Sequence, residues 1–552
     1  MPESLKNIFL FDPESPMIFT RLYFWGFFLI VLLFYSLLYK RKALRNFYLF
    51  AVSYFFYYKT GGLFVFVLLF STLADYLLGH AIYRAKRTTV KKLWLSFSIL
   101  ISLTVLCFFK YDYFFTDTIN RIFHTHFEAV THAALWSNHL LGTHFDISQM
   151  LPPVGISFFT FQTMSYVIDL YRGLVKPVKS PFDYAFYVSF FPQLVSGPIV
   201  RASEFIPQLY KDYAVTEEEF GLAIYMILKG LFKKMCIGDY IAVNLIDRVF
   251  ANPSSYTGFE NLMGLYGYSL QVYCDFSGYT DIAIGLALLM GFKLPQNFNS
   301  PYKARNVGDF WKRWHMSLSS WLKDYLYIPM GGNRGASFFT YVSLASVLIF
   351  IVLLSGNLWL GLLFILIAIV IWALTLLFPN LRRTLSTNVN LMMTMLIGGL
   401  WHGANWTFVI WGGLNGLGLV VYKFWRKISP YEKSNHWLAT LWKIFLTFNF
   451  ITFTRIWFRG ESLQGTFDLL NQVGSNFGWS QVPAMGSAYW KVLLVMLLGF
   501  VLHWLPYATK DRLLGWFINT PVYAKILLCC LVVFIIYQAV SADLQPFIYF
   551  QF

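Results

Sequence analysis

The stretch DFWKRWHMSLSSWLKDYLYIP, residues 309–329, interrupts a chain that consists mostly of long apolar runs. It places charged side chains and a histidine between tryptophans, tyrosines and leucines. Backbone of this kind is tolerated at membrane depth only when it is buried in protein or lines a water-filled cavity. We therefore expect residues 300–335 to form a re-entrant or in-plane element that lines an entrance on the cytoplasmic side.

The apolar runs on either side of this stretch identify a membrane protein. Of the 552 residues, 57% are hydrophobic and 13% are charged, whereas soluble domains carry about 25% charged residues. A transmembrane helix needs roughly 20 mostly apolar residues, and such runs predict about eleven to thirteen crossings. We expect an all-α integral membrane protein. Its predicted parts are N-terminal helices (1–110), an outer amphipathic segment (111–150), a core (151–425) and C-terminal helices with an aromatic tail (426–552).

The net charge of +16 indicates orientation rather than binding to nucleic acid. Basic residues gather in short loops, such as 40–45, 84–92 and 423–427, and loops of this kind lie on the cytoplasmic side of membrane proteins. Two apolar runs separate the clusters at 40–45 and 84–92, and an even number of runs separates each pair of the later clusters at 381–383, 423–427 and 510–512. The number of crossings between about 180 and 300 stays open. The pattern predicts a multi-pass protein in contact with lipid, with both termini on the outer side.

Cysteine and histidine spacing gives no sign of a metal site or of a disulfide framework. The cysteines lie in apolar or interfacial surroundings without the spacing of metal ligands. A group of histidines lies in the outer segment without flanking carboxylates, which is typical of a wet interfacial loop. These histidines are His124, His126, His132, His139 and His144.

The opening stretch also predicts which of its side chains face inward. If it is helical, one face combines a histidine with apolar residues. That face consists of Trp311, His315, Leu318 and Leu322. The histidine therefore points into the protein, either as a functional group or as a hydrogen-bonded packing residue.

Basic side chains beside this histidine have two interpretations. They form a cationic entrance that attracts an anionic ligand, or they only mark the cytoplasmic side. The residues concerned are Lys303, Arg305, Lys312 and Arg313.

A second histidine lies in the stretch LIGGLWHGANWTFVIWGGLNG, residues 396–416. Glycines at 399, 403, 412 and 416 have the spacing that lets membrane helices approach closely. His402 lies near the turn between two cytoplasmic basic clusters, so we expect it to be deep in the membrane domain. Histidine is the side chain best suited to accept a proton near neutral pH, which makes His402 a candidate base.

Several motifs together resemble one known family. They are FWKRWHMSLSSWLKDYLYIPMGGNR (310–334), GGLWHGANWTFVIWGGLNG (398–416), YCDFSGYTDIAIG (273–285), PVGISFFTFQTMSYVIDLYRG (153–173) and FFPQLVSGPI (190–199). In this order they resemble the membrane-bound O-acyltransferases, in particular the bacterial branch of alginate and peptidoglycan O-acetyltransferases and teichoic acid D-alanyl transferases. The resemblance implies a ring of helices around a thinned core, with a cytoplasmic tunnel and an outer funnel.

The resemblance also implies an activity. Members transfer an acyl group from a cytoplasmic thioester to a hydroxyl, and two motif histidines correspond here to His402 and His315. We expect acetyl-coenzyme A as the donor substrate, with no tightly bound cofactor. The acceptor is an extracytoplasmic polysaccharide such as alginate, or peptidoglycan, reached with a secreted acetyltransferase partner. Trp401 and Asn405 either orient His402 or pack beside the turn.

The alternative function is a polytopic transporter or polysaccharide-export component without acyl transfer. Such proteins also have many helices with buried polar groups, but transporter folds commonly contain internal repeats. We find no convincing repeat between the two halves of this chain.

The last residues, QPFIYFQF (545–552), are too apolar for a free tail in water. Aromatic side chains often anchor a chain at the membrane boundary. The tail also resembles the F-x-Y-x-x-F ending of a small partner peptide of teichoic acid D-alanyl transferases, matched here by Phe547, Tyr549 and Phe552. That resemblance predicts that Tyr549 carries the acetyl group between the membrane enzyme and its secreted partner.

Overall fold

The computed structural model describes residues 9–12, 15–127, 135, 138–139, 153–460, 462–539 and 547. Within these residues the secondary structure is helical and contains no strand, which confirms the predicted all-α class. The chain forms two compact units, each assembled from separate stretches of sequence. Unit 1 comprises Met1–Ser102, Pro153–Leu318 and Thr440–Phe552, and unit 2 comprises Leu103–Pro152 and Ser319–Ala439. The predicted division into four consecutive parts is a different description of the chain and stays a prediction.

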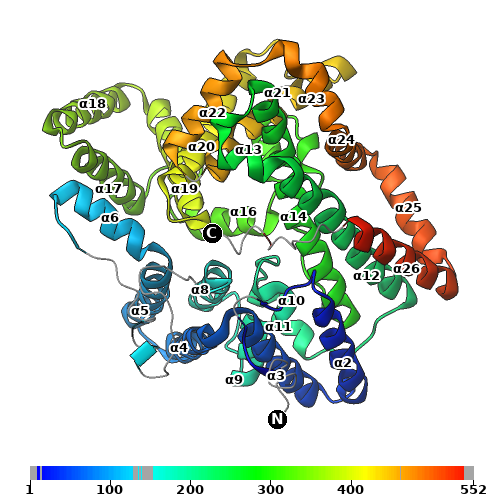
Figure 1. Cartoon of the computed structure of the whole chain (residues 1–552). Coiled ribbons are helices and arrows are strands. Elements are labelled where there is room, and N and C mark those ends of the chain that lie inside the picture. Colours follow the sequence, from blue (N-terminus) through cyan, green and yellow to red (C-terminus); the bar gives the residue numbers. More distant parts are fainter. Residues whose placement is uncertain are drawn as a thin grey trace. The chain divides into compact units, whose positions relative to one another are not determined.

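The most extensive helix pairing in unit 1 joins α14 (Gly258–Leu289) to α12 (Glu217–Leu231) (Figure 1). Small residues allow this close approach, since a Cβ atom added to Gly285 would lie 2.6 Å from the carbonyl oxygen of Ala223. Both helices begin with a capping box, at Thr216 and Thr257, in which a glutamate three residues on completes the cap. These caps satisfy amide groups at the helix start that have no partner within the helix.

Helix α14 is continuous although two aspartates lie in its apolar sequence. Asp275 pairs with Lys234 of the π-helical segment η3 (Phe232–Asp239), which follows α12 directly. Asp281 pairs with Lys233 at 2.7 Å and with Lys229 at 3.2 Å. Buried charges are tolerated when they are paired, so the lysines of α12 and η3 explain how α14 remains one buried helix.

The remaining helices of unit 1 come from the N-terminal, middle and C-terminal parts of the chain. An aromatic cluster, in which Phe24 packs on Phe56 and Phe191, joins the N-terminal helices to the middle of the chain. The N-terminal and middle helices are α2 (Leu22–Leu38), α3 (Lys42–Gly61), α4 (Val65–Arg84), α5 (Thr88–Leu106, which continues into unit 2), α8 (Ile156–Arg172), α9 (Pro181–Ser189), α10 (Phe191–Leu194), α11 (Ala202–Leu209), η4 (Ala242–Ile246), α13 (Asp247–Ala251), η6 (Pro301–Lys303), α15 (Val307–Trp311) and α16 (Met316–Leu322, shared with unit 2). The C-terminal helices are α21 (Trp437–Arg459), α22 (Leu463–Ser475), α23 (Val482–Ala488), α24 (Trp490–Trp504), α25 (Tyr507–Asn519) and α26 (Val522–Ala539).

Unit 2 is built around the pair α19 (Pro379–His402) and α20 (Trp406–Ile428). A Cβ atom on Gly399 would lie 2.3 Å from the carbonyl oxygen of Phe408, and one on Gly412 would lie 2.3 Å from that of Met395. The predicted close approach of glycine-bearing helices is therefore confirmed at these two positions. The other helices are η2 (Cys107–Tyr111), α6 (Asp112–Phe123), η7 (Lys323–Tyr327), α17 (Phe338–Ser355) and α18 (Leu358–Leu377).

Several helices have the length and composition of membrane spans. In the part of the chain that the structure describes, six helices pass this test, or eight if each of two bent helix pairs counts as one span. This number is lower than the expected eleven to thirteen because some apolar runs fold into shorter pieces. Residues 182–200, for example, form α9 and α10, of 9 and 4 residues. Helix α18 has no buried residue, as expected for a helix surrounded by lipid.

Candidate active site

The stretch around His315 forms two short helices joined by a turn, not one continuous helix. Helix α15 ends at Trp311 and α16 begins at Met316, and His315 between them has a φ of 45°. A histidine in this left-handed region is uncommon and is held there by its surroundings. The expectation that Trp311 and His315 share one helical face is therefore wrong, whereas the inward position of His315 is correct, since its exposed fraction is 0%.

Asn297 fixes the turn that carries His315. Its carbonyl oxygen accepts a hydrogen bond from the amide of Met316 at 2.9 Å, and its side-chain Oδ1 accepts one from the amide of Ser317 at 3.1 Å. Oδ1 also lies 3.2 Å from Nδ1 of His315. Because Oδ1 is an acceptor, Nδ1 of His315 donates, and in the neutral ring Nε2 keeps the lone pair. Sequence reasoning missed Asn297, which is 18 residues away from His315.

Burial determines the charge of His315. Phe158 and Phe276 pack against its ring, with centroids at 6.3 and 4.7 Å. Burial lowers the pKa of His315 to about 3, because an apolar environment disfavours the charged imidazolium. His315 is therefore neutral at physiological pH.

His402 is the last residue of α19 in unit 2. Only 3% of it is exposed, and two tryptophan rings lie nearly perpendicular to its imidazole. The ring centroid of Trp401 lies at 4.9 Å and that of Trp411 at 5.0 Å. Asn405 forms the N-cap of α20, since its Oδ1 accepts a hydrogen bond from the amide of Thr407. The buried position that the sequence predicted for His402 is confirmed, and Trp401 contacts it directly.

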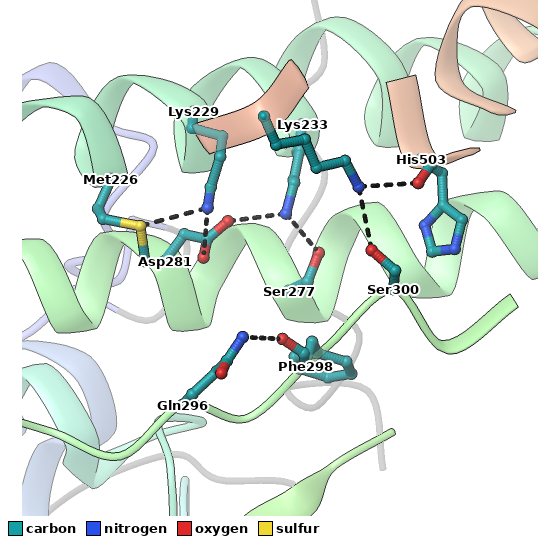
Figure 2. Close-up of polar contacts among 10 residues, drawn as sticks. Met226, Lys229, Lys233, Ser277, Asp281, Gln296, Phe298, Ser300 and His503 are labelled. Carbon is teal, nitrogen blue, oxygen red and sulfur yellow. Dashed lines mark hydrogen bonds and ion pairs between the residues drawn. The ribbon is translucent and has the colours of Figure 1, made fainter. Parts of the chain in front are cut away.

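A group of cations in unit 1 gathers around the loop that follows α14. Figure 2 shows Lys229 and Lys233 directed at Asp281, with Ser300 and His503 nearby. Lys510 donates to Oγ of Ser300 at 3.0 Å and to the carbonyl oxygen of His503 at 2.8 Å. We call the residues Lys229, Lys233, Lys303, Arg313 and Lys510 the cation cluster.

Tyr507 connects the remaining members of the cation cluster. The Lys303 ammonium lies 4.3 Å from its ring centroid, and Arg313 donates to its hydroxyl at 2.9 Å. Burial and the neighbouring Arg313 guanidinium lower the pKa of Lys303. Arg313 pairs with Asp309 at 2.8 Å. Five cations thus face two carboxylates, Asp281 and Asp309, so the cluster carries excess positive charge.

The structure brings together two of the four basic residues that the sequence singled out. Lys303 and Arg313 belong to the cation cluster, whereas Arg305 and Lys312 are exposed. Sequence reasoning missed Lys229, Lys233 and Lys510. The signal for the first two was available, because lysines four residues apart lie on one face of a helix.

Part of the C-terminal tail lies within the described residues. Phe547 is buried, with 1% exposed, and its ring lies 4.5 Å from that of Tyr279. The ammonium of Lys234 lies 4.8 Å from the centre of the same ring. Tyr549 and Phe552 lie outside the described residues, as do His132 and His144, while His124, His126 and His139 are exposed.

Comparison with known proteins identifies the family. Residues 175–388 match the membrane-bound O-acyltransferase family, MBOAT. The chain is 30% identical to the peptidoglycan O-acetyltransferase of Helicobacter pylori, over 93% of this chain and 92% of that protein. It is 31% identical to the probable alginate O-acetylase AlgI of Pseudomonas putida, over 95% and 98%.

A third relative is more distant. The teichoic acid D-alanyltransferase of Bacillus subtilis is 29% identical over 56% of this chain and 69% of that protein. The relatives are acyltransferases, so the alternative of a transporter is not favoured. The buried histidines, the apolar helices and these similarities lead to one conclusion: the chain belongs to the membrane-bound O-acyltransferase family and is a multi-pass membrane acyltransferase.

Proposed function

We propose that this protein moves an acetyl group from cytoplasmic acetyl-coenzyme A across the bacterial inner membrane to an extracytoplasmic polysaccharide. The two relatives that it matches over more than nine tenths of both chains are named as acetyl-transferring proteins, one for peptidoglycan and one for alginate. The D-alanyltransferase matches little more than half of this chain. This difference favours acetyl over D-alanyl as the transferred group.

The observation that carries the proposal is the position of His402. A thioester is already activated, so the enzyme has to remove a proton from the incoming hydroxyl. His402 is a buried imidazole at the end of α19, enclosed by Trp401 and Trp411. In the proposed step His402 takes the proton of the hydroxyl, the hydroxyl oxygen bonds to the acetyl carbon, and the carbon–sulfur bond breaks. The coenzyme A thiolate leaves and takes the proton from the His402 imidazolium, which restores the neutral base.

The cation cluster is the proposed site for the phosphates of the donor. Lys303 and Lys510 donate to uncharged oxygens, of Leu505 for Lys303 and of Ser300 and His503 for Lys510. Their positive charge therefore remains available for an anion. Arg313 adds a planar guanidinium, which suits phosphate recognition. Arg305 and Lys312 act at longer range, as exposed charges that attract the donor.

Tyr549 is the proposed acceptor of the first transfer. The acetyl group moves from sulfur to the phenol oxygen of Tyr549, and a secreted acetyltransferase then passes it to the polysaccharide hydroxyl, which restores the phenol. A covalent intermediate of this kind divides one difficult transfer into two easier steps. The burial of Phe547 between Phe19, Tyr279 and Lys234 supports a tail that docks within the protein.

Purified protein in liposomes with radiolabelled acetyl-coenzyme A tests the activity. We expect release of coenzyme A and labelled polysaccharide when polysaccharide and partner are supplied. Substrate passage across the liposome membrane without thioester cleavage would contradict the proposal.

Tyr549→Phe tests the relay, because it keeps the aromatic ring and removes the nucleophile. We expect membrane insertion to be unchanged and transfer to the outer acceptor to stop. Intact-mass analysis without partner should show one acetyl adduct on the C-terminal peptide of the parent protein only. Near-normal acetylation by Tyr549→Phe would leave Tyr549 as an anchor.

A further inference from the structure

The end of α19 that carries His402 is held by a distant part of unit 2. The last carbonyl groups of an α-helix have no partner within the helix. At α19 these groups face the π-helical turn η2 (Cys107–Tyr111), about 290 residues earlier in the chain. Single π-helical turns inside α-helices occur often at functional sites, because the extra residue redirects the side chains around it.

Two consecutive side chains of η2 bind three consecutive carbonyl groups of α19. Nζ of Lys110 donates to the carbonyl oxygen of Trp401 at 2.9 Å and to that of His402 at 3.0 Å. The hydroxyl of Tyr111 donates to the carbonyl oxygen of Leu400 at 2.7 Å. The helix therefore ends at His402 with its final turn fixed from outside.

Burial of the Lys110 side chain costs free energy of desolvation, which suggests that the residue has a function. It is buried, with 5% exposed, and lies in the helical span Thr88–Phe123, in which only 17% of an 18-residue apolar stretch is buried. Ionisable side chains in such spans are rare and point to function. The amine of Lys110 supplies donors to two carbonyl groups at the end of α19 that have no partner within the helix. Its two hydrogen bonds lie at the backbone of the proposed base and of the tryptophan beside it.

We propose that Lys110 is a positioning residue for acyl transfer, which holds the backbone of His402 so that the imidazole keeps its place beside the reacting hydroxyl. This inference rests on the proposed role of His402 as the base. A misplacement of about 1 Å at a reacting group can cost roughly 100-fold in rate. Loss of Lys110 should therefore lower turnover without weakening donor binding, because the cation cluster lies on other elements.

The test compares full-length variants in detergent or liposomes. We expect Lys110→Met to lower kcat at least about tenfold and to leave the KM for acetyl-coenzyme A within about twofold. Lys110→Arg, which keeps N–H donors for both carbonyl groups, should recover most of the lost rate. Tyr111→Phe removes one of the three bonds and should have a smaller effect. Lys92→Met, at an exposed lysine of the same helical span Thr88–Phe123, is the matched control and should behave like the parent protein.

A second readout does not depend on turnover. Diethyl pyrocarbonate modifies neutral imidazoles, and peptide mass spectrometry gives the rate at each histidine. We expect Lys110→Met to change the modification rate of His402 by more than about threefold, and to leave that of the exposed His436 unchanged. If Lys110→Met does not fold, Lys110→Gln replaces it in both measurements.

The outcomes separate this inference from the proposed function. An unchanged kcat in Lys110→Met would overturn the positioning role. The role would also be overturned if kcat fell only in proportion to the fraction of folded protein while the modification rate of His402 stayed the same. Full activity of His402→Ala would instead overturn the base assignment, and the modification rates would still report whether Lys110 positions the ring.

Discussion

The two histidines are held in opposite ways. In unit 1 the side chain of Asn297 is hydrogen-bonded to the ring of His315, and that ring is packed against Phe158 and Phe276. In unit 2 the backbone of His402 is held by Lys110, and the ring lies nearly perpendicular to two tryptophan rings. The first arrangement fixes a neutral ring, whereas the second fixes the position of the ring that we propose as the base.

This difference assigns different tasks to the two sites. A ring whose pKa is about 3 is a poor proton acceptor near pH 7, since an efficient base has a pKa near the working pH. His402 is therefore the better candidate base. The loop that holds His315 through Asn297 also contains Ser300, a partner of Lys510 in the cation cluster, which connects His315 to the proposed donor site.

Replacing each histidine by alanine is the strongest test of the different roles proposed for His402 and His315. We expect His402→Ala to lower turnover by about 10²- to 10⁴-fold, the range for loss of a general base. His315→Ala should retain more activity than His402→Ala at pH 7. Coenzyme A release measures both, and His436→Ala, at an exposed histidine of unit 2, is the control. A larger loss from His315→Ala would reverse the assignment.

The pH dependence of stability tests the neutral state of His315. In an unfolded chain histidine has a pKa of about 6.5, so the unfolded state binds a proton at His315 below that pH. In the folded protein His315 binds this proton only near pH 3. Stability therefore falls as pH decreases through this window. Between pH 7 and pH 5 this one group should cost about 2 kcal/mol of unfolding free energy.

His315→Gln removes this titration and keeps a donor for Asn297. Thermal unfolding at pH 7 and pH 5 should thus show a smaller loss of stability on acidification for His315→Gln than for the parent protein. His436→Gln should keep the parent slope. Equal slopes in all three proteins would mean that His315 titrates normally.

Loss of charge in the cation cluster should have a smaller effect, which is confined to the KM for the donor. Lys303→Gln combined with Lys510→Gln should raise the KM for acetyl-coenzyme A about tenfold, equivalent to about 1.4 kcal/mol, and should reduce its dependence on salt. Acetyl-phosphopantetheine carries fewer phosphates, so its KM should change less. Lys491→Gln, at an exposed lysine of α24, is the control. Equal changes for both donors would exclude phosphate recognition by the cluster.

The smallest expected effect separates Arg313 from its neighbour Lys312. Arg313→Gln should raise the KM for acetyl-coenzyme A, because the guanidinium bridges Tyr507 and Asp309 within the cation cluster. Lys312→Gln removes an exposed charge and should change KM by less than about twofold, as is usual for surface charges. Equal changes in KM for the two variants would mean that Arg313 and Lys312 attract anions only in a general way.

The sequence by itself determined the features that depend on local pattern. Apolar runs predicted an all-α membrane protein, and glycine spacing predicted the contact between α19 and α20. Polar residues in an apolar setting marked His315 and His402, and both are buried. These features follow from residue type and from helical period, and both can be read directly from the amino-acid sequence.

Only the tertiary structure decided which groups act on those histidines. The left-handed backbone at His315 depends on Asn297, the cation cluster combines residues from α12, η6 and α25, and Lys110 reaches His402 across 292 positions of sequence. Side-chain hydrogen bonds act over about 3 Å, so they depend on how helices pack. Helix packing brings together groups that are far apart in the sequence, and no local sequence pattern indicates that they meet.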